Sequence, residues 1–161
     1  MSLGMIAILG LPAFGQEPYG PIADVKLAKP EDGKDQPTTP PPAGAIVLFD
    51  GKNLDEWTKG DKKSPAGFKL VDGGAMQVAG GNVFSKKSFG DNFKLHVEFR
   101  VPYMPKATGQ GRGNSGIYLQ GRYEVQVLDS YDNKTYADGQ AAAIYGQTPP
   151  MVNACRKPGE W

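Results

Sequence analysis

The chain has 161 residues and carries 18 lysines and arginines against 17 aspartates and glutamates, a net charge of +1 that gives no basic field for nucleic acid. Its single cysteine excludes an intrachain disulfide and a cysteine-rich zinc site, and its single histidine, His96, excludes a site with several histidine ligands. No apolar run reaches the roughly 20 residues that a membrane-spanning helix needs, so we expect neither a nucleic-acid partner nor a membrane span.

The N-terminal region has two parts. Residues 1–15 are apolar, and Ala13-Phe14-Gly15 before Gln16 fits the cleavage pattern of a secretory signal, although the segment lacks Lys and Arg. We therefore expect a signal peptide over 1–15 and a periplasmic or secreted protein; the alternative is an apolar N-terminus that is buried or frayed. Residues 16–44 are rich in proline, which favours a linker or strap without regular structure. The globular domain is expected over 45–161.

From residue 45 onward, short apolar runs alternate with turn signals rich in Gly, Asp and Asn, and no segment has a helical period. The expected strands are 46–49, 68–71, 76–78, 93–101, 117–120 and 123–128. Strict alternation over 93–101 predicts a strand with apolar residues facing the core, beside 123–128 in one sheet. Gly121-Arg122 is expected to form a two-residue hairpin turn. This spacing predicts an all-β, antiparallel jelly-roll sandwich.

Polar and apolar residues also alternate along 123–128. Glu124 and Gln126 share one face of this strand, whereas the tyrosine and valines share the other. Strict alternation would put Asp129 on the apolar side, so we predict a bulge at 127–128 that returns it to the polar face. Two carboxylates with an amide between them suit acid–base chemistry. The alternative is the solvated outer face of a sandwich.

The segment from Glu124 to Asp129 resembles the Glu-x-Asp-x-x-Glu strand of laminarinase-like retaining glycosidases, with Gln126 and Asp129 as departures. A wider resemblance is to the 3-keto-disaccharide hydrolase family. Five motifs that resemble those of this family occur in order, over 47–57, 92–100, 113–118, 123–129 and 153–161. The resemblance implies a concanavalin A-like sandwich, export, and cleavage of glycosides whose sugar is oxidised at C3. Relatives continue past the last motif, so we expect a truncated domain with open strand edges.

The substrate suggests a mechanism, because a ketone at C3 makes the proton at C2 acidic. Glu124 is the expected base and Asp129 the expected acid, with Gln126 and His96 as donors to the oxyanion. The side chains expected to bind the sugar are Gln126, His96, Glu98, Arg100, Asn114, Arg112 and Tyr118. Alternatives stay open for two groups: cross-strand salt bridges among Glu98, Arg100 and Glu124, and a solvated turn around Arg112.

Other motifs in the sequence give less information about function. The match of 111–116 to G-x-G-x-x-G opens a strand and not a helix, so it indicates no dinucleotide site. The Asp and Asn residues over 129–133 miss the EF-hand spacing, and we expect no metal and no other cofactor. Asn133-Lys-Thr135 is a sequon, which suggests an exposed loop, and Cys155 is expected to be a small buried residue. A non-catalytic carbohydrate-binding module and a structural domain are the competing hypotheses, and no oligomeric state is predicted.

Overall fold

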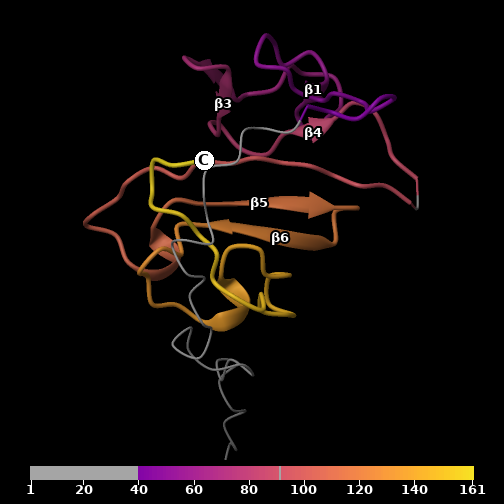
Figure 1. The fold of residues 1–161 in the computed structure, drawn as a ribbon. Helices are drawn as coiled ribbons and strands as arrows, with labels where there is room; N and C mark the ends of the chain where they lie inside the picture. Colours follow the sequence, from indigo (N-terminus) through magenta and orange to yellow (C-terminus); the bar gives the residue numbers. More distant parts are fainter. Residues whose placement is uncertain (1–39, 91) are drawn as a thin grey trace, which may run out of the picture. The chain divides into compact units, whose positions relative to one another are not determined.

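The computed structural model describes residues 40–90 and 92–161 (Figure 1). The predicted signal peptide over 1–15 and nearly all of the proline-rich segment over 16–44 lie outside the described residues. The described chain falls into two compact units, one ending at His96 and the other running from Val97 to Trp161. In the described part of the chain, no helix has the length and apolarity to cross a membrane.

The unit that ends at His96 contains two short antiparallel pairs. Strand β1, Trp57–Thr58, pairs with β4, Phe84–Ser85, and β2, Lys69–Val71, pairs with β3, Ala75–Gln77. The predicted strands over 68–71 and 76–78 correspond to β2 and β3. The predicted strand over 46–49 does not form; instead, the carbonyl of Leu48 accepts a 2.6 Å hydrogen bond from the indole of Trp57.

Residues 93–101 differ from the prediction. Within the described ranges, no strand is assigned to this segment and no ladder pairs with it. Leu95 and Val97 are 47% and 46% exposed, so the expected core-facing strand beside 123–128 is wrong. The alternating pattern is present, but a strand also needs a partner to satisfy its backbone groups. Only Val101 is buried, and its carbonyl accepts a 2.9 Å hydrogen bond from the Gly159 amide.

The unit from Val97 to Trp161 is built around one hairpin. Strand β5, Asn114–Leu119, pairs antiparallel with β6, Tyr123–Leu128 (Figure 1). The turn is closed by the Arg122 amide, which donates to the Leu119 carbonyl at 3.0 Å. Its central residues are Gln120 and Gly121, with φ of 55° and 66°, the positive values that a type I′ turn requires. The predicted hairpin is therefore confirmed, but three residues, 120–122, lie between the paired Leu119 and Tyr123, so the expected two-residue turn is one residue too short.

Residues 142–145 lie along the other edge of β6. The Ala142 amide donates to Gln126, the Gln126 amide donates to Ala143, and the Tyr145 amide donates to Glu124, at 2.8, 3.0 and 2.9 Å. Strand β6 is therefore central, between β5 and this segment. The core of the unit gathers here, where Val127, Leu128, Ala137 and Ala143 are buried.

The described residues confirm an all-β architecture. The helical segments in the described ranges are two short 3-10 turns, η3 over Gly109–Gly111 and η4 over Ala137–Gly139. All the strand pairs are antiparallel.

Candidate active site

One face of the hairpin carries a carboxylate between two tyrosines. Tyr118 on β5 lies directly opposite Glu124 on β6, and the Tyr118 hydroxyl donates to Glu124 Oε2 at 2.8 Å. On the other edge of β6, the bridge between Val125 and Ile144 puts Tyr145 opposite Glu124 on this same face. The hydrogen bond to the Glu124 carboxylate raises the pKa of Tyr118, because ionising the phenol would place two negative charges together. Tyr118 is 57% exposed, so this face is open to a ligand.

Gly116 provides the space for the Glu124 side chain. Gly116 lies opposite Gln126, and this pair is the next one on the same face after Tyr118 and Glu124. A Cβ atom at Gly116 would lie 2.7 Å from Glu124 Cγ and Cδ, closer than side-chain atoms approach one another. The Glu124 carboxylate therefore lies directly over the backbone of Gly116, in the space that a side chain there would occupy. An isolated glycine in a strand pattern often marks such a close approach, so the sequence carried this signal.

Gln126 lies on the same face but beneath other residues, at 2% exposure. Its side-chain amide donates to Gln110 Oε1 at 3.0 Å, and the Gln110 amide donates to the carbonyl of Gly139 and the hydroxyl of Thr135, both at 2.9 Å. Asn114, at the start of β5, donates to the Gln110 carbonyl at 3.0 Å. Gln126 thus forms the floor of the site, and Gln110, which sequence reasoning missed, holds this floor together.

A second pair of tyrosines was also missed. The hydroxyls of Tyr136 and Tyr145 are hydrogen-bonded to each other, and their rings meet edge to face with centroids 6.1 Å apart. The Tyr136 ring lies over Gly139, where a Cβ atom would come within 2.6 Å of its Cδ2 atom. No local pattern in the sequence marks these tyrosines, because Tyr145 reaches the site through the pairing of 142–145 with β6.

Asp129 lies on the opposite face from Glu124. The Asp129 amide donates to the Gly113 carbonyl at 2.8 Å, which continues the register of the hairpin beyond the pair of Asn114 and Leu128. The predicted bulge at 127–128 is therefore wrong, and so is the expectation that both carboxylates share a face with Gln126. The ladder stays regular because each residue of β6 has its own partner on β5.

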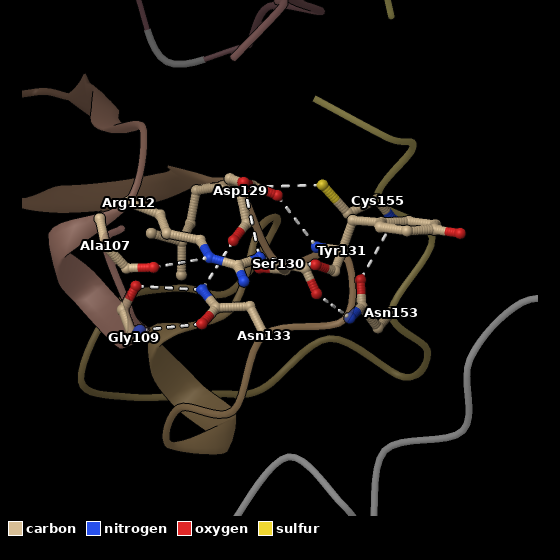
Figure 2. Close-up of polar contacts among 10 residues, drawn as sticks. Ala107, Gly109, Arg112, Asp129, Ser130, Tyr131, Asn133, Asn153 and Cys155 are labelled. Carbon is tan, nitrogen blue, oxygen red and sulfur yellow. Dashed lines mark hydrogen bonds and ion pairs between the residues drawn. The ribbon is translucent and has the colours of Figure 1, made fainter. Parts of the chain in front are cut away.

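Arg112 is the counter-ion of Asp129, which is 1% exposed (Figure 2). Arg112 Nη1 lies 3.6 Å from Asp129 Oδ2 and donates to the Tyr131 carbonyl at 2.8 Å, while Nε donates to the Ala107 carbonyl at 3.2 Å. The Tyr131 amide donates to Asp129 Oδ1 at 3.3 Å. Both charged groups therefore have partners within the fold, whereas the sequence analysis predicted that Arg112 binds the sugar.

Asn133 belongs to the same buried polar cluster (Figure 2). Its amide nitrogen donates to the carbonyls of Asp129 and Gly109 at 2.7 and 3.0 Å, and its oxygen accepts from the Gly109 amide at 2.8 Å. The expectation that the sequon lies in an exposed loop is therefore wrong for its asparagine. Burial has a reason here, because the amide satisfies three backbone groups that would otherwise lack partners.

Cys155 is partly buried beside β6, and its thiol donates to the Leu128 carbonyl at 3.4 Å. Burial raises the pKa of the Cys155 thiol, because the thiolate would lose hydration. The Cys155 amide donates to Asn153 Oδ1, and Asn153 in turn donates to the Ser130 carbonyl at 2.7 Å (Figure 2). These contacts fit the structural role expected of this cysteine.

His96, Glu98 and Arg100 are exposed and lie in the segment that forms no strand in the described residues. The Arg100 guanidinium lies 4.8 Å from the centroid of the Trp161 ring, a cation–π distance. No strand pairing brings these three side chains to the face of Glu124 within the described ranges. Their contact with a sugar stays a prediction.

Comparison with known proteins identifies the family. The model of the 3-keto-alpha-glucoside-1,2-lyase-like domain matches residues 44–161. The chain belongs to this family. A crystal structure of a "putative glycosyl hydrolase" from Parabacteroides distasonis ATCC 8503 is 38% identical, with a TM-score of 0.65. That match covers 83% of this chain and 62% of the other, so this chain spans less than two thirds of the solved relative. No curated protein matches.

If Glu124 is a reacting group in this 3-keto-alpha-glucoside-1,2-lyase-like domain, Gly116→Ala should lower kcat by roughly 10²-fold, because a shift of about 1 Å in a reacting group has that effect. The added methyl group would push the Glu124 carboxylate away from Tyr118. Steady-state kinetics on a 3-keto-glucoside measure the loss, and urea unfolding checks that the variant folds. Gly111→Ala is the matched control, since a Cβ atom there meets nothing within 4 Å. Equal activity of both variants would show that the position of Glu124 is unimportant.

Proposed function

We propose that this domain cleaves 3-keto-glycosides by carboxylate-assisted elimination, with Glu124 as the base. The observation that carries the proposal is the position of Glu124, on an open face, over bare backbone and beside two tyrosines. The family description, which names a 1,2-lyase of a 3-keto-alpha-glucoside, and the glycosyl hydrolase description of the solved relative support the same chemistry.

The reaction follows from the substrate. Glu124 removes the proton at C2, whose acidity comes from the neighbouring ketone at C3, and an enolate forms. The enolate then expels the glycosidic oxygen from C1 and leaves a C1–C2 double bond. Addition of water across that bond would complete a net hydrolysis. No nucleophilic carboxylate is needed, which agrees with the placement of Asp129 on the other face.

Tyr118 orients the base. Its hydroxyl is hydrogen-bonded to Glu124 Oε2, which leaves Oε1 above Gly116 as the atom that takes the proton. The hydrogen bonds that Gln110 makes with Gln126 and with Asn114 connect η3 to both strands of the hairpin on this face. Asn114, exposed at the start of β5, is the proposed sugar contact on this side.

Two further proposals rest on the sequence and the family. We infer that the protein is exported, from the apolar segment over 1–15 and its small-residue cleavage pattern. We also infer that its all-β fold is a concanavalin A-like jelly-roll sandwich. His96, Glu98 and Arg100 are proposed to contact the sugar in that fold.

Mass spectrometry of the products in D₂O tests the function. Methyl 3-keto-α-glucoside is incubated with the protein, and methyl α-glucoside, which has a hydroxyl at C3, is the control substrate. We expect cleavage of the keto substrate alone, with an unsaturated sugar or a product that carries deuterium at C2. The rate of spontaneous exchange at C2 is measured on 3-keto-glucose without protein. Cleavage of both substrates, or a saturated product without deuterium at C2, would contradict elimination, and saturable binding without any turnover would favour the carbohydrate-binding module.

A further inference from the structure

We propose that Tyr145 is the general acid of this site, which protonates the departing glycosidic oxygen, and that Tyr136 stabilises the phenolate that remains. This inference rests on the proposed function. Elimination needs two proton transfers, one from C2 to a base and one to the leaving oxygen. With Asp129 on the far face and buried, the second transfer needs another group near Glu124.

Strand pairing places Tyr145 beside the base. The Tyr145 amide donates to the Glu124 carbonyl at 2.9 Å, and the register through Val125 and Ile144 sets the two side chains on one face. Side chains that are directly opposite in an antiparallel pair have Cβ atoms roughly 5 Å apart. A base and an acid at this spacing can reach neighbouring atoms, C2–H and the oxygen on C1, of one sugar ring.

The pair of Tyr136 and Tyr145 can donate a hydroxyl proton to a ligand. Tyr136 and Tyr145 bring two hydroxyl protons and share one hydrogen bond, which uses only one of them. When Tyr136 donates to Tyr145, the proton of Tyr145 is available to a ligand, and Tyr145 is 39% exposed. After transfer, the same Tyr136 hydroxyl donates to the Tyr145 phenolate and stabilises its charge.

Tyr118 is less suited to this role. Its proton is already directed at Glu124 Oε2, at 2.8 Å, and the adjacent carboxylate opposes ionisation of its phenol. Loss of the Tyr118 proton would also leave two anions in contact. Tyr118 therefore orients the base, and Tyr145, on the other edge of β6, supplies the acid.

The backbone holds the tyrosine pair in place. The Tyr136 ring lies over Gly139, where any side chain would collide with it, and the Gly139 carbonyl accepts from the Gln110 and Gln126 amides at 2.9 and 3.4 Å. The floor of the site thus positions η4, and η4 positions Tyr136. The second tyrosine is therefore a positioning residue, because it acts through Tyr145.

The proposed step balances. The C2–H electron pair forms the enolate as the proton moves to Glu124, the C1–O bond breaks, and the oxygen takes the Tyr145 proton. The products are an alcohol and a sugar with a C1–C2 double bond. Glu124 then releases one proton to solvent and the Tyr145 phenolate takes one back, so no oxidant or further reactant is needed.

Leaving-group dependence tests the assignment. Wild type, Tyr145→Phe, Tyr136→Phe and the control Tyr123→Phe, on the opposite face, are assayed on methyl and 4-nitrophenyl 3-keto-α-glucosides. Methanol is a poor leaving group that needs an acid, and nitrophenol is a good one that does not. We expect Tyr145→Phe to lower kcat by roughly 10²-fold or more on the methyl substrate and by less than about threefold on the nitrophenyl substrate. Tyr136→Phe should show the same selectivity with a smaller loss.

The outcomes separate the two proposals. If wild type cleaves neither keto substrate, the proposed function fails, and this inference fails with it. If wild type cleaves both and Tyr145→Phe loses activity equally on both, or on neither, Tyr145 is not the acid and Glu124 can still be the base. Thermal unfolding of each variant accompanies the kinetics, because an equal loss on both substrates is also what a misfolded variant would give.

Discussion

Glu124→Gln is expected to lower turnover of methyl 3-keto-α-glucoside by roughly 10²–10⁴-fold, the usual contribution of a general base. Glutamine keeps the size of the side chain and an oxygen that can accept from Tyr118, so the hairpin and its turn should fold as before. What the variant lacks is the basic oxygen that takes the C2 proton. The measurement is kcat under saturating substrate, with urea unfolding as the check on stability.

Glu56→Gln is the matched control, an exposed glutamate in the other unit, and its activity should equal that of wild type. Substrate affinity adds a second readout, because loss of a base lowers kcat with little change in binding. Full activity of Glu124→Gln would remove Glu124 as the base. Cleavage would then depend on another group that takes the C2 proton.

Arg112→Leu is expected to destabilise the protein by about 3–5 kcal/mol, the range for removal of one partner from a buried ion pair. Asp129, at 1% exposure, would lose its counter-ion, and the carbonyls of Ala107 and Tyr131 would lose their donors. Urea unfolding followed by tryptophan fluorescence measures the change. Arg122→Leu, at the exposed hairpin turn, is the control and should shift stability by less than about 0.5 kcal/mol.

A double variant separates the charge from the packing. In Arg112→Leu with Asp129→Asn, the buried charge is gone, so part of the lost stability should return, because residues of one buried pair are not additive. A loss below about 1 kcal/mol in the single variant would contradict the role of Arg112 as the counter-ion. Such a result would again make Arg112 a candidate for contact with the sugar.

The parts of the fold that local pattern controls could be predicted. Alternation along 123–128 and the glycine of the turn are sufficient for a hairpin, and the alternation put Glu124 and Gln126 on one face, as the register has them. The pattern over 93–101 is just as regular, yet no partner pairs with it in the described ranges. Alternation specifies which residues share a face, but a strand also depends on a neighbour that the pattern does not name.

The candidate site was only half predictable for the same reason. Tyr118, Glu124 and Gln126 lie on strands with clear alternation, whereas Tyr145 arrives through pairing with a segment that has no such pattern. The bulge at 127–128 was expected because Asp129 was assumed to share the polar face of the strand with Glu124 and Gln126. The regular ladder instead turns Asp129 inward, where Arg112 makes a buried charge tolerable.

The buried amide of Asn133 has a consequence for the choice of expression host. In the folded protein, this amide is bound to Asp129 and Gly109, so an oligosaccharyltransferase could reach it only before the chain folds. A glycan added at that stage would occupy the amide that holds η3 against the end of β6, and would be too large to bury. In a eukaryotic secretory host, glycan transfer to Asn133 would therefore compete with folding. A bacterial host that lacks this modification avoids the competition.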